Sequence, residues 1–175
     1  GAENTAVGKG ALNANTTAGN NVAVGRSALL VNTTGSENTA VGTNSLDANT
    51  TGTNNVALGY NALTANTTAN FNTALGDQSL ETNTTGASNT AVGRKALEAN
   101  TTASYNTAVG DSALLANTTG EENVAVGYTA LDANTTGVSN VGIGSGALST
   151  NAQGDNSTAV GTNALFTQNP SGNAD

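Results

Sequence analysis

Aliphatic residues recur along this chain at a fixed spacing of 17 positions. One series runs from Val7 to Val160 through Val, Leu or Ile, and a second runs from Leu12 to Leu165 and is Leu at every step. Two further series, which begin at Asn4 and Gly8, keep the same spacing. Residues 17 apart are called a column here, named after its first member. A constant period of this kind indicates stacked structural repeats.

Each repeat follows the approximate pattern N-[T/V]-A-V-G-x-x-A-L-x-A-N-T-T-G-x-x. The T/V-A-V part alternates with period two and ends at Gly, which predicts a short strand. The A-L-x-A-N-T-T part is a second candidate strand, and the Gly8 and Ala18 columns mark the turns between the two. The sequence therefore predicts an all-β fold: a parallel β-solenoid of ten 17-residue coils with two short strands per coil, forming one domain over residues 1–175.

Charged residues avoid the regular columns. All four cations lie in the Lys9 column and the next one, and the acids, apart from the C-terminal one, occupy only variable columns. Because charged side chains are rarely buried without a partner, we expect the Val7 and Leu12 columns to face inward and the variable columns to face outward. Ordering 17 residues costs about 25 kcal/mol, whereas a buried Val or Leu returns only about 1.5–3 kcal/mol. Coils should therefore fold only when stacked, and the thin core favours association of several chains.

Composition excludes several classes of function. Twelve acids against four bases give a net charge of −8, which argues against nucleic acid as a partner. No apolar run reaches the length of a membrane span, so we expect no direct membrane insertion. His and Cys are absent, so we expect no enzyme activity, no cofactor and no metal site. Since the chain begins within a repeat, we expect it to be a fragment of a longer protein.

Some repeats resemble those of a known family. The stretches Asn-Val-Ala-Val-Gly at 21–25 and 123–127 and Asn-Val-Ala-Leu-Gly at 55–59 resemble the head repeat of YadA-like trimeric autotransporter adhesins. The longer unit resembles repeats of phage tail fibres and surface proteins, many of which end in an S74-type chaperone domain. The resemblance implies a left-handed β-roll, a homotrimer, a location outside the cell or on a virion tail fibre, and a role in adhesion or as a shaft. The 17-residue unit and its regular Asn-Thr-Thr block depart from the adhesin pattern.

Two threonines follow Asn in eight successive repeats. Alternation along a strand lets only one of them point outward. An outward Thr column on a flat face is how some solenoids bind ice, whereas a structural reading makes the Thr residues a ladder between coils. The candidate surface column consists of Thr17, Thr34, Thr51, Thr68, Thr85, Thr102, Thr119 and Thr136.

The aromatic residues lie in variable columns and are candidates for contact with a partner. Four of them are the candidate contact residues: Tyr60, Phe71, Tyr105 and Tyr128. Glu81 and Glu98 lie one coil apart in one column, where they could hold a cation or be a solvated pair. The Asn-Thr-Thr blocks also match the N-glycosylation pattern, with repeat inheritance as the alternative.

Two functions remain open from the sequence. The first is a structural or adhesive fibre segment, the shaft or head of a trimeric surface adhesin or tail fibre, with a host surface or glycan as ligand. The alternative is a monomeric solenoid that binds ice or a polysaccharide through its Thr ladder. The mass in solution distinguishes them, because the fibre requires association.

Overall fold

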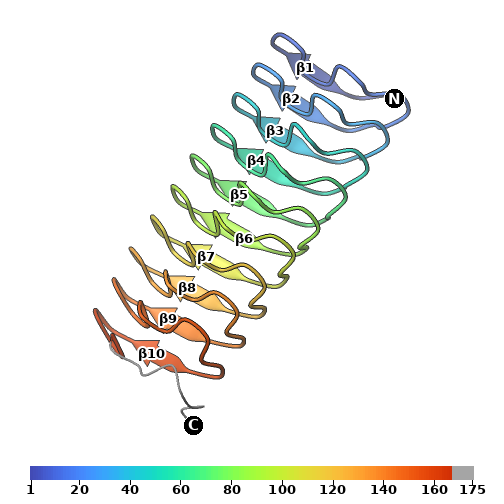
Figure 1. Ribbon diagram of the computed structural model, residues 1–175. Coiled ribbons are helices and arrows are strands. Elements are labelled where there is room, and N and C mark those ends of the chain that lie inside the picture. The colour runs from blue at the N-terminus through green and yellow to red at the C-terminus, as the bar shows by residue number, and fades with distance from the viewer. Residues whose placement is uncertain (167–175) are drawn as a thin grey trace.

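The computed structural model describes residues 1–166, which form a rod of stacked coils (Figure 1). Ten three-residue strands make one parallel sheet in the order β1 to β10, and each pairs with the next in a register of 17. The predicted parallel β-solenoid is therefore confirmed. The strands are β1 (Thr5–Val7), β2 (Val22–Val24), β3 (Thr39–Val41), β4 (Val56–Leu58), β5 (Thr73–Leu75), β6 (Thr90–Val92), β7 (Thr107–Val109), β8 (Val124–Val126), β9 (Val141–Ile143) and β10 (Thr158–Val160).

Each coil contains one strand rather than the two that the sequence predicted. The A-L-x-A-N-T-T segment consists of turns, because its Leu lies in the left-handed region, as at Leu29 with φ 50° and Leu97 with φ 54°. An extended strand cannot contain such a residue. The segment still bonds to the next coil, as in the Leu29 N–H to the Ser45 carbonyl at 3.1 Å. Coils therefore stack on this side without forming a second sheet.

The core consists of the Leu12 column and two Ala columns, those of Ala6 and Ala11. From Leu29 to Leu148 every Leu of the column is fully buried, and so are Ala23 and Ala28. A left-handed non-glycine residue costs about 1–2 kcal/mol, and burial of Leu returns about 1.5–3 kcal/mol. Burial therefore offsets the unfavourable backbone of the leucines.

The Val7 column faces outward, which corrects the prediction that it would be buried. Strand alternation places Thr5 and Val7 on one side and Ala6 on the other, and the small Ala side is the one that meets the leucines. The exposed fraction is 58% at Val7, 49% at Leu58 and 68% at Val160. The interior is too thin for a Val layer, so the branched side chains lie on the surface.

Glycine is required where the strand ends. Gly93 has φ 134°, and a Cβ there would lie 2.4 Å from the carbonyl oxygen of Gly110 in the next coil. No other residue tolerates both this backbone conformation and this close approach. The Gly8 column therefore sets how closely the coils stack at that corner.

Candidate functional surfaces

The Asn side chains of the Asn4 and Asn15 columns are buried, and they form hydrogen bonds to neighbouring coils. Asn38 Oδ1 accepts the backbone N–H of Asn55 at 3.0 Å, and its Nδ2 donates to the Gly52 carbonyl at 2.8 Å. Asn49 Nδ2 donates to the same carbonyl at 3.0 Å and to Asn32 Oδ1 at 2.8 Å. Both columns therefore serve the fold. The Asn-Thr-Thr acceptors from Asn32 to Asn134 are fully buried, which excludes their glycosylation in the folded rod.

The two threonines of each block have different environments. In the Thr16 column, each hydroxyl from Thr16 to Thr135 donates to a carbonyl of the next coil, as in Thr101 Oγ1 to Thr118 O at 3.1 Å. The Thr17 column is exposed at all eight positions, and its hydroxyls make no hydrogen bond within the described chain. The candidate surface column is thus a single row of free hydroxyls.

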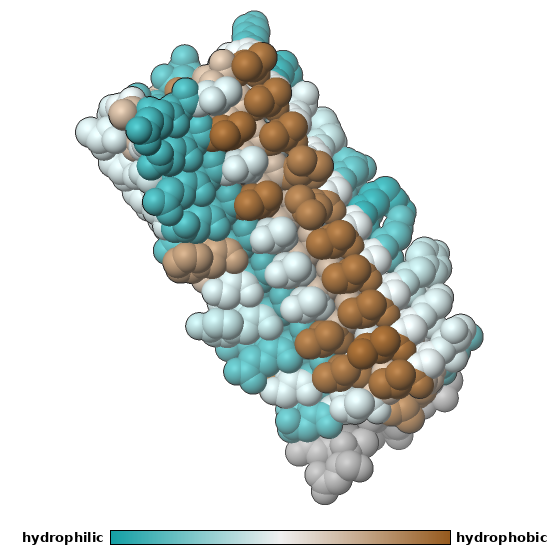
Figure 2. Space-filling view, turned by 180° about the vertical axis from the view of Figure 1, so that it is seen from behind, coloured by the Kyte–Doolittle hydropathy of each residue, from teal (hydrophilic) through white to brown (hydrophobic). Residues whose placement is uncertain are grey.

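The outer side of the sheet carries two parallel columns that bear no charge. Thr or Val occupies the Thr5 column, and Val, Leu or Ile occupies the Val7 column. Figure 2 shows the resulting hydrophobic stripe along the length of the rod. On the strand spacing the strip is about 40 Å long and about 10 Å wide. This surface is called the sheet face below.

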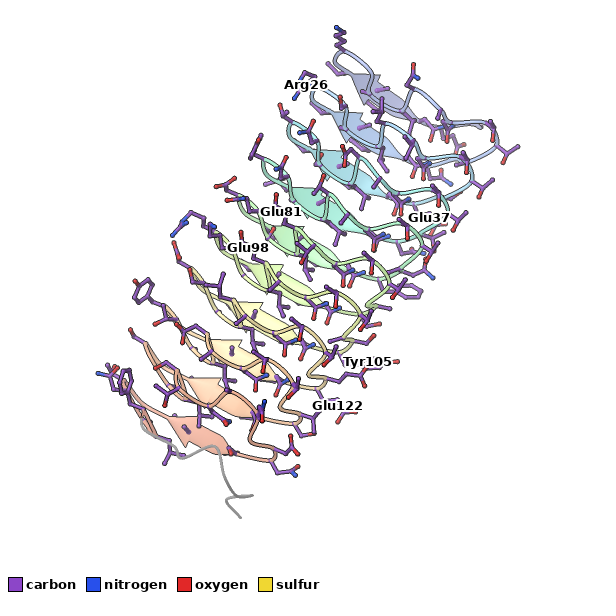
Figure 3. The ribbon with its side chains drawn as sticks, viewed as in Figure 1. Arg26, Glu37, Glu81, Glu98, Tyr105 and Glu122 are labelled. Carbon is purple, nitrogen blue, oxygen red and sulfur yellow. The ribbon has the colours of Figure 1, made fainter. Side chains whose placement is uncertain are left out.

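The aromatic residues divide between the two edges of the rod. Tyr60 and Tyr128 belong to the Lys9 column, whereas Phe71 and Tyr105 belong to the Glu3 column, and all four are more than half exposed. Figure 3 places Glu37, Tyr105 and Glu122 along one edge and Arg26, Glu81 and Glu98 along the other. The structure therefore does not bring the four candidate contact residues together.

The acids of the Arg26 edge have separate partners. Glu81 accepts hydrogen bonds from Asn61 at 2.9 Å and Gln78 at 2.8 Å, while Glu98 pairs with Lys95 at 2.9 Å. These contacts favour a solvated surface pair over a shared cation. Within residues 1–166 no group of three or more acids could hold a metal ion.

Two aspartates on this edge have shifted pKa values in opposite directions. The hydrogen bond from Ser112 is the largest cause that lowers the pKa of Asp111; desolvation opposes it, and Arg94 and Lys95 lower the pKa further. Desolvation raises the pKa of Asp132, whose Oδ1 atom is buried without a hydrogen-bond partner.

Sequence reasoning missed the sheet face because it treated regular columns as buried. A signal was present: the Thr5 column contains both Thr and Val, the Val7 column varies among Val, Leu and Ile, and the Ala6 column is nearly constant. Exchange of a hydroxyl for a methyl group, as between Thr and Val, and variation in aliphatic size, as between Val and Leu, are both typical of a surface, whereas a close-packed interior restricts them.

Comparisons with known proteins find no match, whether among protein-family models, curated proteins or solved structures. In residues 1–166 there is no helix long and apolar enough to cross a membrane.

Proposed function

We propose that the chain is a segment of a structural or adhesive fibre, in which several copies associate side by side through their sheet faces. The observation that carries the proposal is the outward aliphatic column, which is exposed or half-buried in all ten strands. The strip covers about 400 Å² on the strand spacing, with one wholly aliphatic column beside one of mixed Thr and Val, and uncharged surfaces of this size often mark interaction sites. A shaft needs a contact that repeats along its length, and this strip repeats at every coil.

Charge favours the sheet face as the contact between like copies. The chain carries a net charge of −8, so two copies repel each other in most orientations. The columns from Asn4 to Gly8 contain no charged residue, whereas both edges of the rod carry acids. Contact through the sheet face therefore keeps the charges at the rim and exposed to solvent.

The resemblance to trimeric adhesins implies three copies, and a cyclic trimer would bring the three sheet faces together at a common axis. A cyclic arrangement uses one face of each chain and closes without free contacts. The rods would lie parallel, with the aliphatic columns at the centre and the Thr17 columns at the outside. Such a bundle suits the shaft or head of a surface adhesin or tail fibre, located outside the cell.

Light scattering of the purified chain tests the association. We expect a mass three times that of the chain, and a monomer for the variant Val41→Lys, Leu75→Lys, Val109→Lys, which places charges in alternate coils of the sheet face. The matched control is Thr51→Lys, Thr85→Lys, Thr119→Lys, with the same charge change in the same coils, and it should keep the parent mass. A parent chain that remains monomeric at micromolar concentration would contradict the proposal.

The free hydroxyls of the Thr17 column support one second candidate, a monomeric solenoid that binds ice or a polysaccharide. Eight threonines at a constant spacing present a regular row of donors and acceptors. Thermal hysteresis tests the ice reading, and Thr51→Tyr with Thr68→Tyr should abolish it. The absence of hysteresis in the parent would end this candidate. A single row gives fewer contacts than the two-column sheet face, which is why the fibre is preferred.

A further inference from the structure

Phe71 and Tyr105 occupy an unfavourable backbone position. Their φ angles are 61° and 62°, in the left-handed region that bulky residues rarely adopt. The other members of the Glu3 column adopt the same conformation, but they are Asn, Ser or Glu. Asn in particular tolerates it, since its side chain can bond locally. The two aromatic residues therefore stand where the local backbone favours smaller polar ones.

Burial does not compensate these two residues. Phe71 is 62% exposed and Tyr105 is 64% exposed, whereas the left-handed Leu97 is fully buried. The rod itself thus gains little from either ring, and each leaves apolar surface in water. The repeat imposes this backbone on every member of the column, so only the choice of an aromatic side chain is left without a reason in the fold, and exposed aromatic residues are typical of contact sites. An external ligand would supply the missing burial.

The spacing and surroundings of the rings indicate the kind of ligand. Two coil steps separate Phe71 from Tyr105, which is about 9.6 Å on the spacing of parallel strands. Ser88 lies between them in the same column, so no large side chain blocks the track. In an extended β-1,4-linked glycan, one sugar spans about one coil step, and alternate sugars would therefore reach the two rings. The apolar face of a sugar ring stacks on an aromatic face.

The charge of this edge restricts the ligand further. Glu121 and Glu122 lie in the coil after Tyr105, and Glu37 lies two coils before Phe71. All four cations belong to the opposite edge, in the columns of Lys9 and Gly10. Carboxylates without neighbouring cations repel an acidic polysaccharide and attract protonated amines. A sugar amine near Tyr105 would gain both a carboxylate and the face of the ring.

We propose that the edge bearing Phe71, Tyr105, Glu121 and Glu122 binds a linear β-1,4-linked glycan with free amino groups, which lies parallel to the rod axis. The two rings stack on alternate sugars, and the two glutamates bind the amino group of the sugar next to the one on Tyr105. This edge borders the sheet face, but it contains none of the Thr5 and Val7 columns that form that face, so the proposal does not rest on the association of chains.

Calorimetric titration with a β-1,4-linked glucosamine hexamer, at mildly acidic pH, tests the proposal. The variant Phe71→Ser with Tyr105→Ser should bind at least about tenfold more weakly. Ser is suited to these positions, since Ser88 and Ser139 adopt the same conformation in this column. The matched control is Tyr60→Ser with Tyr128→Ser on the opposite edge, which should bind like the parent.

The N-acetylated hexamer separates stacking from charge. It should bind the parent more weakly than the amino form, and the Phe71→Ser, Tyr105→Ser variant should lose this binding too. Glu121→Gln with Glu122→Gln should weaken only the amino form. No binding by the parent, equal loss in the Tyr60→Ser, Tyr128→Ser control, or no effect of removing Phe71 and Tyr105 would each overturn the proposal. The last result would indicate charge attraction alone.

Discussion

The Asn-Thr-Thr side of the rod and its sheet face are equally regular in sequence, but the repeated side chains make different contacts on the two sides. On the Asn-Thr-Thr side the buried Asn amides and the Thr16 hydroxyls bond to the neighbouring coil, so the chain itself explains why these residues repeat. On the sheet face the Val7 column has no side chain that can form such hydrogen bonds, and its members are exposed or half-buried in every coil. A repeated residue can therefore serve the fold or serve a partner, and only its environment distinguishes the two.

The Asn4 column should show a dependence of folding on one side chain as large as that of any core residue. Replacing Asn89 with Ala removes the acceptor of the buried Asn106 N–H and a donor to the Ala103 carbonyl. An unpaired buried group and a lost hydrogen bond together cost about 3 kcal/mol. Urea denaturation should measure this loss. The exposed Asn13→Ala variant should stay within about 0.5 kcal/mol of the parent, and an equal loss in both would contradict the role of the buried amide.

One coil allows a direct comparison of an inward and an outward aliphatic residue. Leu97→Ala should lower the free energy of unfolding by about 3 kcal/mol, because Leu97 is fully buried. Val92→Ala in the same coil should lower it by under about 1 kcal/mol in the monomeric Val41→Lys, Leu75→Lys, Val109→Lys background. If the Val92 loss matched that of Leu97 in this background, the sheet face would belong to the core.

Sequence alone predicted the stacking but not the direction of each column. An uninterrupted 17-residue period fixes which residues lie above one another, and the strand at T/V-A-V followed from its alternation. The second strand was wrong because Leu rarely adopts a left-handed backbone, and only burial between coils makes Leu29 do so. The orientation of Val7 depends on whether the interior has room for Ala or Val, which is a property of the assembled coil. The chemistry of Phe71 and Tyr105 likewise needed their backbone angles and exposure.

Neighbouring threonines within one block test the comparison at a smaller scale. Thr101→Val removes the hydroxyl that donates to the Thr118 carbonyl at 3.1 Å, and this should cost about 1 kcal/mol. Thr102→Val makes the same chemical change at an exposed position and should have almost no effect on stability. Both values follow from denaturation curves of the two variants. A loss at Thr102 as large as that at Thr101 would show that the outer column also supports the fold.

Asp132 should produce the smallest effect, and one that depends on pH. Its pKa is raised by desolvation, so the folded state disfavours the carboxylate that is present at neutral pH. As the pH falls through this raised pKa, the folded chain takes up the proton first, and stability rises until the unfolded pKa of about 3.9 is passed. Asp132→Asn should therefore be more stable than the parent at neutral pH, by a margin that shrinks on acidification. Asp132 is partly exposed and solvent screens its charge, so the effect should be small. The exposed Asp77→Asn variant is the control, because it also removes one negative charge. If Asp132→Asn and Asp77→Asn changed the free energy of unfolding equally at every pH, burial of the Asp132 Oδ1 atom would have no effect on stability.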